Sequence, residues 1–250
     1  MSKRLTRRSL LTLAAPAVLI GCDRLGATPS FKQLVLGAGE WLGTRIGPFV
    51  VGDALAPEFA EAEMSPDFRV NGNTMPNDPA YAALMRNGFA DWSLPIGGLV
   101  TTPAQYALAE LKALPQRTQI TLHNCVEGWS AIGKWTGVPL SEILRTAGLQ
   151  PNAKFVVFRC ADDFNGTPYY ESIDLRSAMH PQTILAHTMN DAPLPVGHGA
   201  PVRLRVERKL GYKHAKFIMG VEVVASLDGV GRGKGGFWED VGDYDWYAGI

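Results

Sequence analysis

Cys125 is the residue whose type and position point most directly to chemistry. It follows the alternating run from Arg117 to His123 and stands shortly before the turn-forming pair Glu127-Gly128. A thiol at the end of a strand is placed to face a cleft, where it can bind a soft metal, act as a nucleophile or pair in a disulfide. Each of these three roles leads to a different function.

Arg203 and Arg205 are a second feature with chemical potential. They alternate with apolar residues in the segment 202–206, so both guanidinium groups lie on one face of a predicted strand. A guanidinium group there can hold a phosphate through two hydrogen bonds. The alternative is a strand face that is simply exposed to solvent.

The elements that must position these residues are predicted by alternation and by proline and glycine punctuation. We expect strands at 94–100, 117–123, 154–160, 183–189, 201–207 and 216–224. Helices are expected at 103–114, at 139–147 and, capped by Asp174, at 175–179. Because strands and helices interleave irregularly, with a turn at 190–193, the sequence predicts an α+β fold with a mixed sheet rather than a doubly wound parallel one.

The N-terminus has the pattern of an export segment. Arg7 and Arg8 precede an apolar run, Leu10 to Ile20, that is shorter than the about 20 residues needed to cross a bilayer. A basic start followed by a short apolar stretch is typical of a segment that is removed. The paired arginines favour the twin-arginine route, which exports folded proteins. An ordinary secretory segment that holds two arginines is the alternative.

Cys22 ends the sequence Leu19-Ile20-Gly21-Cys22, which resembles the lipobox of bacterial lipoproteins. In such proteins the cysteine is acylated, and Asp23 resembles the residue that keeps them at the inner membrane. A lipid on Cys22 would anchor the protein without a spanning helix. We therefore expect a periplasmic protein at the inner membrane, with a discarded segment containing a buried cysteine as the alternative.

Composition and charge narrow the class of protein. The formal net charge is zero, which provides no field to attract nucleic acid. Apolar residues make up 46% and charged residues 19%, as in a soluble globular enzyme. We expect an export segment at 1–22, a tether and N-terminal extension at 23–65, and one globular domain at 66–250.

Several motifs together resemble the sulfite oxidase family of molybdenum enzymes. In chain order they are His-Asn-Cys-Val-Glu-Gly-Trp at 123–129, Met-His-Pro-Gln-Thr at 179–183, His-Gly-Ala-Pro-Val-Arg at 198–203, Leu-Gly-Tyr-Lys-His-Ala-Lys at 210–216, and the tail 238–248. Their order and spacing match the family from about residue 66 to the C-terminus. The bacterial periplasmic branch that includes the methionine sulfoxide reductase catalytic subunit is the most similar.

This resemblance implies a sulfite-oxidase-type fold and a Mo-molybdopterin cofactor in the domain 66–250. In the family, a cysteine at the position of Cys125 gives its thiolate to molybdenum, and the dithiolene of the molybdopterin supplies two further sulfurs. A soft thiolate suits such a metal, which keeps the sulfur deprotonated. The cofactor performs the oxygen-atom transfer, while the protein binds and tunes it.

The resemblance also implies which residues hold the phosphate of the cofactor. Arg203 matches the phosphate-binding arginine of the family, and His198 falls where the family has a pterin-binding histidine or asparagine. Arg205 has no counterpart of this kind, so we expect it to lie on a solvated strand face.

Five further residues are implied to contact the pterin. His214 and Lys216 match a loop that holds it through backbone groups and a lysine. Asn71 and Asn73 resemble the asparagine-containing segment that starts the cofactor pocket, although an Asn-Gly pair is also a common turn. Cys160 falls near a threonine that contacts the pterin in the bacterial branch, and a small buried apolar residue is its alternative role.

Departures from the family bear on the substrate. Sulfite-oxidising members place an arginine in the loop after the metal cysteine, whereas this chain has Glu127 there. An acid beside the metal repels a sulfite dianion, so we expect a neutral S-oxide or N-oxide instead. Glu127 could relay protons, and Tyr244 and Tyr247 could line the substrate mouth.

The chain contains no haem-attachment motif, so we expect it to exchange electrons with a separate partner, such as a membrane or periplasmic cytochrome. It also stops where many sulfite oxidases continue into a dimerisation domain, which leads us to expect a monomer.

Two other classes of protein remain open. A cysteine-nucleophile enzyme of the cell envelope, similar to an L,D-transpeptidase, could use His123 to activate Cys125, because both lie on one strand face. One intervening residue gives that pair poor geometry, and the Ser-His-Gly-Cys signature is missing. A non-catalytic lipoprotein could instead contain a Cys125–Cys160 disulfide, which an oxidising periplasm favours.

Overall fold

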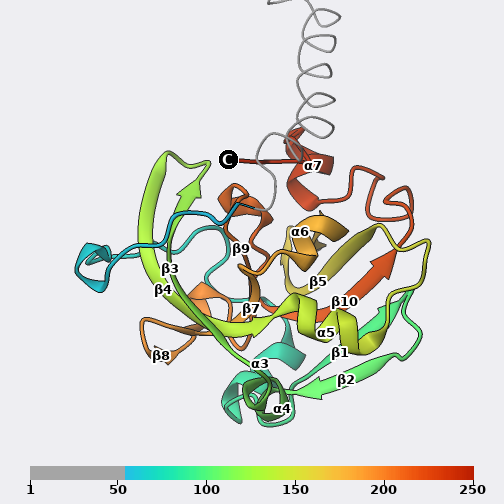
Figure 1. The fold of residues 1–250 in the computed structure, drawn as a ribbon, viewed down its shortest axis with the longest axis horizontal. Helices are drawn as coiled ribbons and strands as arrows, with labels where there is room; N and C mark the ends of the chain where they lie inside the picture. The colour runs from blue at the N-terminus through green and yellow to red at the C-terminus, as the bar shows by residue number, and fades with distance from the viewer. Residues whose placement is uncertain (1–53) are drawn as a thin grey trace, which may run out of the picture. The chain divides into compact units, whose positions relative to one another are not determined.

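The computed structural model describes residues 54–250 (Figure 1). The predicted twin-arginine segment and the predicted lipidation site Cys22 lie outside the described residues. The strands are β1 (Ser93–Gly98), β2 (Ala104–Ala107), β3 (Arg117–Cys125), β4 (Trp129–Pro139), β5 (Phe155–Phe164), β6 (Thr167–Asp174), β7 (Thr183–Met189), β8 (Ala192–Pro193), β9 (Arg203–Val206) and β10 (Ile218–Val224). The helices are α3 (Pro79–Arg86), α4 (Leu108–Ala113), α5 (Leu140–Ala147), α6 (Leu175–Met179) and α7 (Phe237–Gly242), with 3-10 turns η1 (Glu61–Glu63), η2 (Val196–His198) and η3 (Gly211–Lys213).

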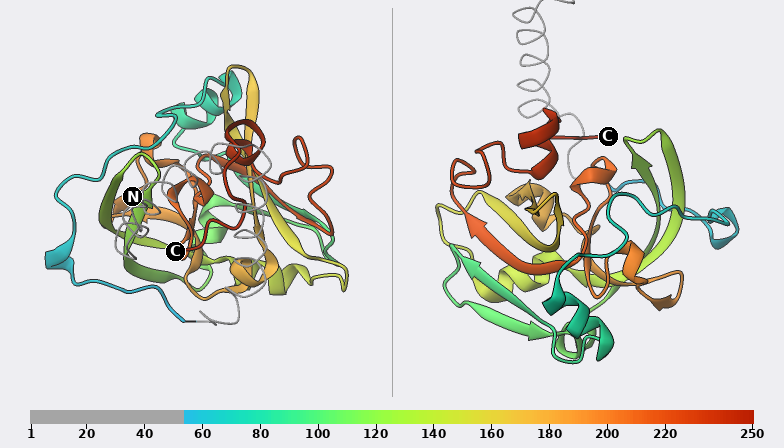
Figure 2. Two further views of the ribbon diagram at one scale, coloured as in Figure 1. Left: turned by 90° about the horizontal axis from the view of Figure 1, so that it is seen from above. Right: turned by 180° about the vertical axis from the view of Figure 1, so that it is seen from behind.

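The strands form two sheets. The first sheet has the order β2-β1-β10-β5-β6, and the second has the order β3-β4-β7-β8 with β9 also paired to β7. The first sheet is mixed, because β1 and β10 are parallel while its other pairs are antiparallel. Figure 2 shows that the β3–β4 hairpin and the β1–β2 hairpin lie on opposite sides of the domain formed by residues 54–250. The predicted α+β fold with a mixed sheet is confirmed.

The main apolar core lies where the two sheets meet, and α5 and α6 pack there (Figure 1). Leu140, Ile143, Leu144 and Ala147 follow helical spacing along α5, and all four are buried. Gly148 ends the helix with a φ of 70°, a conformation that glycine adopts without steric cost. The core therefore fixes β4, which pairs with β3 as far as Cys125, and β5, which continues to Phe164.

Most predicted strands match observed ones, but the helix expected at 103–114 is wrong in its first half. Residues Ala104–Ala107 form β2, which pairs with β1 along the edge of the first sheet, and only Leu108–Ala113 is helical. Backbone hydrogen bonding to a neighbouring strand thus overrides the proline-start pattern. The strands β4 and β6 and the helices α3 and α7 were not predicted.

The segment before the predicted domain boundary lies against the second sheet. Glu58 forms an isolated bridge with Thr121 of β3, and the Ser65 amide donates to the Ile132 carbonyl of β4 at 3.0 Å. Within residues 54–250, no helix is both long and apolar enough to cross a membrane.

Gly98 is the position at which the first sheet is least tolerant of a side chain. It has a φ of 80°, and a Cβ atom built there would meet the Val223 carbonyl oxygen of β10 at 2.2 Å. We expect Gly98→Ala to lower the free energy of unfolding by about 1–3 kcal/mol, measured by urea denaturation. Gly97→Ala is the matched control, because nothing lies within 4 Å of its Cβ position. Equal stability of the two variants would contradict this prediction.

Candidate active site

A pocket that is partly open to solvent lies beside the end of β3, and the empty space within it and at its mouth is about 680 Å³. Its walls come from the loop around Asn71, the turn after β3, the β5–β6 hairpin, η3 and the C-terminal segment. The residues that line it are Asn71, Gly72, Asn73, Cys125, Val126, Glu127, Asp162, Phe164, Tyr169, Gly211, Tyr212, His214, Lys216, Trp238 and Tyr244. Seven of the candidate site residues are therefore brought together: Asn71, Asn73, Cys125, Glu127, His214, Lys216 and Tyr244.

Cys125 sits at the last position of β3, opposite Trp129 of β4. The turn between them is closed by a 3.1 Å hydrogen bond from the Gly128 amide to the Cys125 carbonyl, and Glu127 lines the pocket from within it. Burial raises the pKa of the Cys125 thiol, and the negative charge of Glu127 adds to this effect. The thiol is therefore protonated at neutral pH unless a bound cation stabilises its anion.

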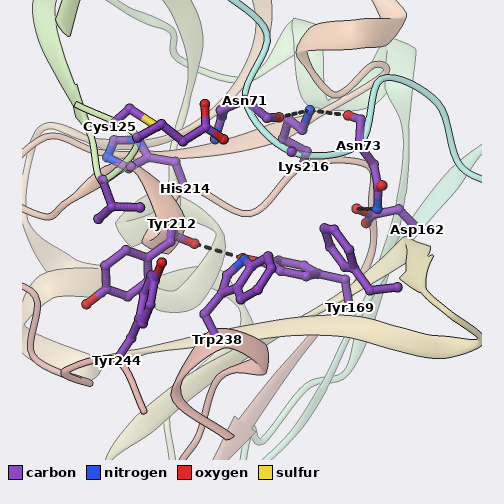
Figure 3. Close-up of a pocket in the computed structure, with 15 residues that line it drawn as sticks. Asn71, Asn73, Cys125, Asp162, Tyr169, Tyr212, His214, Lys216, Trp238 and Tyr244 are labelled. Atoms are coloured by element: carbon purple, nitrogen blue, oxygen red, sulfur yellow. Dashed lines mark hydrogen bonds between the residues drawn. The ribbon is translucent and has the colours of Figure 1, made fainter. Parts of the chain in front are cut away.

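Lys216 organises the polar side of the pocket (Figure 3). Its ammonium group donates to the backbone carbonyls of Asn71, Asn73 and Gly197 at 2.7, 2.5 and 2.9 Å. Burial lowers its pKa to about 7, with the charge of Arg203 acting in the same direction. Two of the ammonium hydrogens thus hold the loop at Asn71 and Asn73, and the third binds Gly197 in η2. Lys216 therefore joins this loop to η2.

Asn73 and Asp162 complete the same side. The Asn73 amide donates to an Asp162 carboxylate oxygen at 3.0 Å and to the Asp163 carbonyl at 2.9 Å. The Asn71 side-chain oxygen and the second Asp162 carboxylate oxygen are buried and have no hydrogen-bond partner within residues 54–250. Burial raises the pKa of Asp162. Both oxygens belong to side chains that line the pocket and are left for a ligand or water.

Aromatic rings form the opposite side of the pocket, as Figure 3 shows. Tyr169 donates its hydroxyl to the Tyr212 carbonyl at 2.8 Å. The Tyr212 and Tyr244 rings meet edge to face at 5.0 Å, and Tyr244 stacks on Trp238 at 5.9 Å. Such a wall favours apolar groups of a ligand. One side of the pocket is therefore polar and the other apolar.

Arg203 and His198 lie behind the polar side and are not among the described residues that line the pocket. Arg203 is fully buried, donating to the carbonyls of His198 at 3.0 Å and His214 at 3.4 Å. Burial lowers the pKa of Arg203 to about 9 and that of His198 to about 4. The Arg203 Nε and the His198 Nδ1 have no hydrogen-bond partner within residues 54–250.

Cys160 and Tyr247 are also absent from the described lining residues. Cys160 pairs with Ile218 in the first sheet and packs against two apolar clusters, and burial raises its pKa. The Tyr247 ring instead faces the Lys209 ammonium, 3.6 Å from the ring centroid. Tyr244 is the C-terminal tyrosine that reaches the pocket.

Comparison with known proteins shows the family. Residues 82–228 match the family described as the oxidoreductase molybdopterin-binding domain. The chain is 37% identical over 239 residues to a protein of Azospira oryzae that carries the inferred name protein-methionine-sulfoxide reductase subunit YedZ1, covering 96% of this chain and 84% of that one. This protein belongs to the molybdopterin-binding oxidoreductase family. The sequence resemblance to the sulfite oxidase superfamily is thereby confirmed.

Two further proteins are similar to this chain. It is 32% identical over 237 residues to the protein-methionine-sulfoxide reductase catalytic subunit MsrP of Xanthomonas axonopodis, which covers 88% of this chain and 70% of the relative. The sulfane dehydrogenase SoxCD of Paracoccus pantotrophus superposes with a TM-score of 0.50 at 24% identity, over 55% of this chain and 39% of that chain. The latter likeness shows the fold alone. The protein is a molybdenum-dependent oxidoreductase whose cofactor is Mo-molybdopterin.

The residues present fit that cofactor. It carries a phosphate, a polar pterin and soft sulfur atoms, and therefore needs cationic, hydrogen-bonding and thiolate partners. Arg203 offers a buried guanidinium with a free N–H, and His198 and Asn71 each offer a buried polar atom without a partner. Native proteins leave few such atoms unsatisfied. Asn71 lines the pocket with Cys125, and Arg203 contacts the backbone of the lining residue His214, so these atoms are suited to a polar ligand there. Within residues 54–250, no three histidine, cysteine or acidic side chains converge on a common metal position.

The solvated position expected for Arg205 is wrong. All four residues of β9 are buried, because the strand lies inside the molecule beside β7. Arg205 makes a two-point ion pair with Glu207, at 2.9 and 2.5 Å, and donates to His123 Nδ1 at 3.1 Å. Alternation identified the shared face of the two arginines but could not show that this face is internal.

The two alternative functions also lose support. Cys125 and Cys160 are both free thiols, so the disulfide is not formed. His123 is a poor general base, because burial and the charge of Arg205 lower its pKa well below the usual value. With the pKa of the Cys125 thiol raised at the same time, the pair lacks the features of an activated cysteine nucleophile.

Several pocket residues were missed by the sequence reasoning. Asp162, two positions after Cys160 in β5, belongs to no motif with a recognisable spacing, and Trp238, the second residue of α7, was noted only as the start of the tail motif. The aromatic residues at 164, 169 and 212 could have been found only by knowing that the β5–β6 hairpin folds against η3. The tail 238–248 was identified as a motif, and Tyr244 was expected at the substrate mouth, but the part played by Trp238 was not predicted.

Proposed function

We propose that this protein is a molybdopterin-dependent reductase of S-oxides of the methionine sulfoxide type, in which Cys125 gives its thiolate to molybdenum. The names of the relatives from Azospira and Xanthomonas support this substrate class. The raised pKa of the Cys125 thiol is consistent with a sulfur that becomes an anion only when a metal binds it.

The charge of the pocket carries the proposal. Among the described residues that line it, Lys216 is the only lysine or arginine, and its hydrogens are already given to three carbonyls. Glu127 and Asp162 add carboxylates. A sulfite dianion would meet repulsion there, whereas a neutral S-oxide would not. The organic arms of an S-oxide would pack on the aromatic wall, and its polar S=O group would face Cys125.

The reduction takes up two electrons and two protons, releasing the sulfide and one water molecule. When bound, the cofactor supplies the oxygen-atom and electron transfer. Glu127 is placed to hold or move a proton, since it lines the pocket from the turn after Cys125. The Trp129 indole donates to its carboxylate at 3.1 Å, which keeps it directed along the turn.

In this proposal the cofactor is bound by the residues that the sequence analysis predicted for it. Arg203 binds the phosphate, and His198 and the backbone beside His214 bind the pterin. Lys216 acts indirectly, because its hydrogen bonds fix the loop that carries Asn71 and Asn73. Cys160 supports the cofactor site indirectly, as part of β5. Tyr247 supports it indirectly as well, as part of the C-terminal segment that brings Tyr244 to the pocket.

The cellular setting is part of the proposal. The paired arginines at 7 and 8 support export to the periplasm, and Cys22 supports a lipid anchor at the inner membrane. Both compared reductases are named as subunits, which supports a separate electron donor. We propose a monomeric catalytic domain that receives electrons from a membrane or periplasmic cytochrome and binds a small-molecule substrate.

A substrate panel tests this function. With reduced viologen as donor, we expect turnover of methionine sulfoxide and aryl methyl sulfoxides, and no detectable oxidation of sulfite with ferricyanide as acceptor. Glu127→Gln should lower kcat by about 100-fold or more at constant molybdenum content, because it removes a proton donor. Arg145→Gln, on the exposed side of α5, is the control for folding. Rapid sulfite oxidation together with inert sulfoxides would sink the proposal.

A further inference from the structure

A row of buried polar side chains leads along β3 to Cys125. Gln119, Thr121 and His123 alternate along the inner face of the strand, and each is 1% exposed. Opposite them lie Arg205 of β9 and Glu207, which are also buried. Such a row is costly unless its members satisfy one another, so its hydrogen bonds decide what it does.

The Arg205–Glu207 pair anchors the row. Glu207 accepts from Arg205 at 2.9 and 2.5 Å and from the Gln119 amide at 2.8 Å. This two-point contact fixes the plane of the guanidinium. The remaining Arg205 nitrogen, Nη1, then points at His123 Nδ1, at 3.1 Å. Glu207 therefore holds Arg205 in the orientation in which its Nη1 donates to His123.

That contact determines which ring nitrogen of His123 carries the proton. A guanidinium has donors and no acceptor, so His123 Nδ1 must accept. In the neutral ring the hydrogen then lies on Nε2. His123 Nε2 is buried and has no hydrogen-bond partner within residues 54–250. The row thus ends in one N–H donor that the described protein does not use.

His123 does not itself line the pocket, but two of its neighbours, His214 and Gly211, do, and none of its described neighbours accepts this hydrogen. The rings of Phe68, Trp129 and His214 lie 5.6, 5.6 and 5.0 Å from the His123 ring, between ring centres. His214 cannot accept, because its Nδ1 already receives the Val206 amide and its Nε2 faces the Lys209 carbonyl. A Cβ atom on Gly211, a pocket-lining residue, would come within 2.6 Å of His123 Nε2.

We propose that His123 is a positioning residue that donates a hydrogen bond from Nε2 to a sulfur or oxygen atom of the bound cofactor beside Cys125, with Arg205 and Glu207 fixing its tautomer. This rests on cofactor binding at Cys125. A donor to such an atom favours the more electron-rich, reduced state and so raises the reduction potential. His123 therefore adjusts the electron affinity of the centre without touching the substrate.

The first test compares two variants of His123 in the loaded protein. We expect His123→Leu to keep molybdenum but to shift the midpoint potential to a lower value and to change the Mo(V) electron paramagnetic resonance spectrum. His123→Gln should restore both properties toward wild type, because its amide supplies an N–H. An unchanged potential and spectrum in fully loaded His123→Leu would overturn the proposal, as would equal changes in both variants.

The second test addresses the tautomer. The double variant Arg205→Met with Glu207→Gln removes the charged pair together and lets the histidine proton move to Nδ1. We expect a lowered potential, in the same direction as in His123→Leu. Arg159→Met is the matched control, since it breaks the exposed Arg159–Glu222 pair of the first sheet and should change neither property. A double variant that keeps the wild-type potential would contradict the role of the pair.

These readouts separate the inference from the proposed function. Potential and spectrum are measured without substrate, so a shifted potential in a protein that reduces no S-oxide would support the role of His123 and count against the substrate alone. Wild-type protein without molybdenum would overturn both.

Discussion

Serine in place of Cys125 should leave a folded protein that carries well under one molybdenum atom per chain and has lost at least about 100-fold of its reductase activity. Changes to residues that merely support a metal ligand cost about 10–100-fold, so loss of the ligand itself should cost more. A hydroxyl is a harder donor than a thiolate and does not ionise at neutral pH, so it does not replace the sulfur. Elemental analysis and the viologen assay measure the two effects.

Two controls make this result specific to the sulfur. Thr118→Val changes the exposed end of the same strand, where Thr118 hydrogen-bonds Thr136, and should keep molybdenum and activity. Compared in their cofactor-free forms, Cys125→Ser and wild type should have similar unfolding midpoints, because the thiol is only half-buried and a bound cofactor would stabilise only the loaded protein. Full molybdenum occupancy with full activity in Cys125→Ser would exclude the proposed ligand.

Lys213→Met should produce the largest loss of stability, about 3–5 kcal/mol in the free energy of unfolding. Lys213 is fully buried in η3, and its ammonium lies 2.5 Å from Glu171 and 2.6 Å from Glu239. Burial alone would lower its pKa, but the two carboxylates outweigh this and raise it. Methionine would leave two buried acids without a cation. Urea denaturation measures the effect, and Arg145→Met, which breaks an exposed pair, should leave the midpoint unchanged.

The loss in Lys213→Met should depend on pH in a defined direction. Burial raises the pKa of Glu171 well above its usual value, and the charge of Lys213 opposes this rise. An acid whose folded-state pKa lies above its unfolded-state value binds protons more readily when folded, so stability falls as pH rises through the folded pKa. Removing Lys213 raises that pKa further. The variant should therefore come closest to wild type in acid, and a loss that grows toward low pH would contradict this account.

The sequence predicted the parts of the fold that depend on local chemistry. Asp174 caps α6 by accepting the Ser177 amide, as expected for that residue type, and β3 ends at Cys125 after a clear alternation. The strand β2 escaped prediction because its residues follow a proline that favours a helix start, whereas their structure comes from pairing with β1. Tertiary pairing decided that element, and a local pattern could not reveal it.

The sequence predicted the site residues that belong to motifs and missed those that distant segments bring together. Cys125, Lys216 and Asn71 were identified from motifs, yet the use of all three Lys216 hydrogens on backbone carbonyls has no sequence counterpart. Arg205 shows the limit most clearly. Alternation gives the face of a strand, but only the packing of β9 inside the molecule shows that this face holds an ion pair.

The fastening of the Asn71 loop by Lys216 has a consequence for how the protein is made. The two residues are 145 positions apart in the chain, and the aromatic wall needs Trp238 and Tyr244 from its end. A growing chain on the ribosome can therefore fold most of the second sheet, but it cannot close the pocket before the last segment emerges. If the cofactor binds in this pocket as proposed, its binding follows translation, and we expect a chain truncated before α7 to retain no molybdenum.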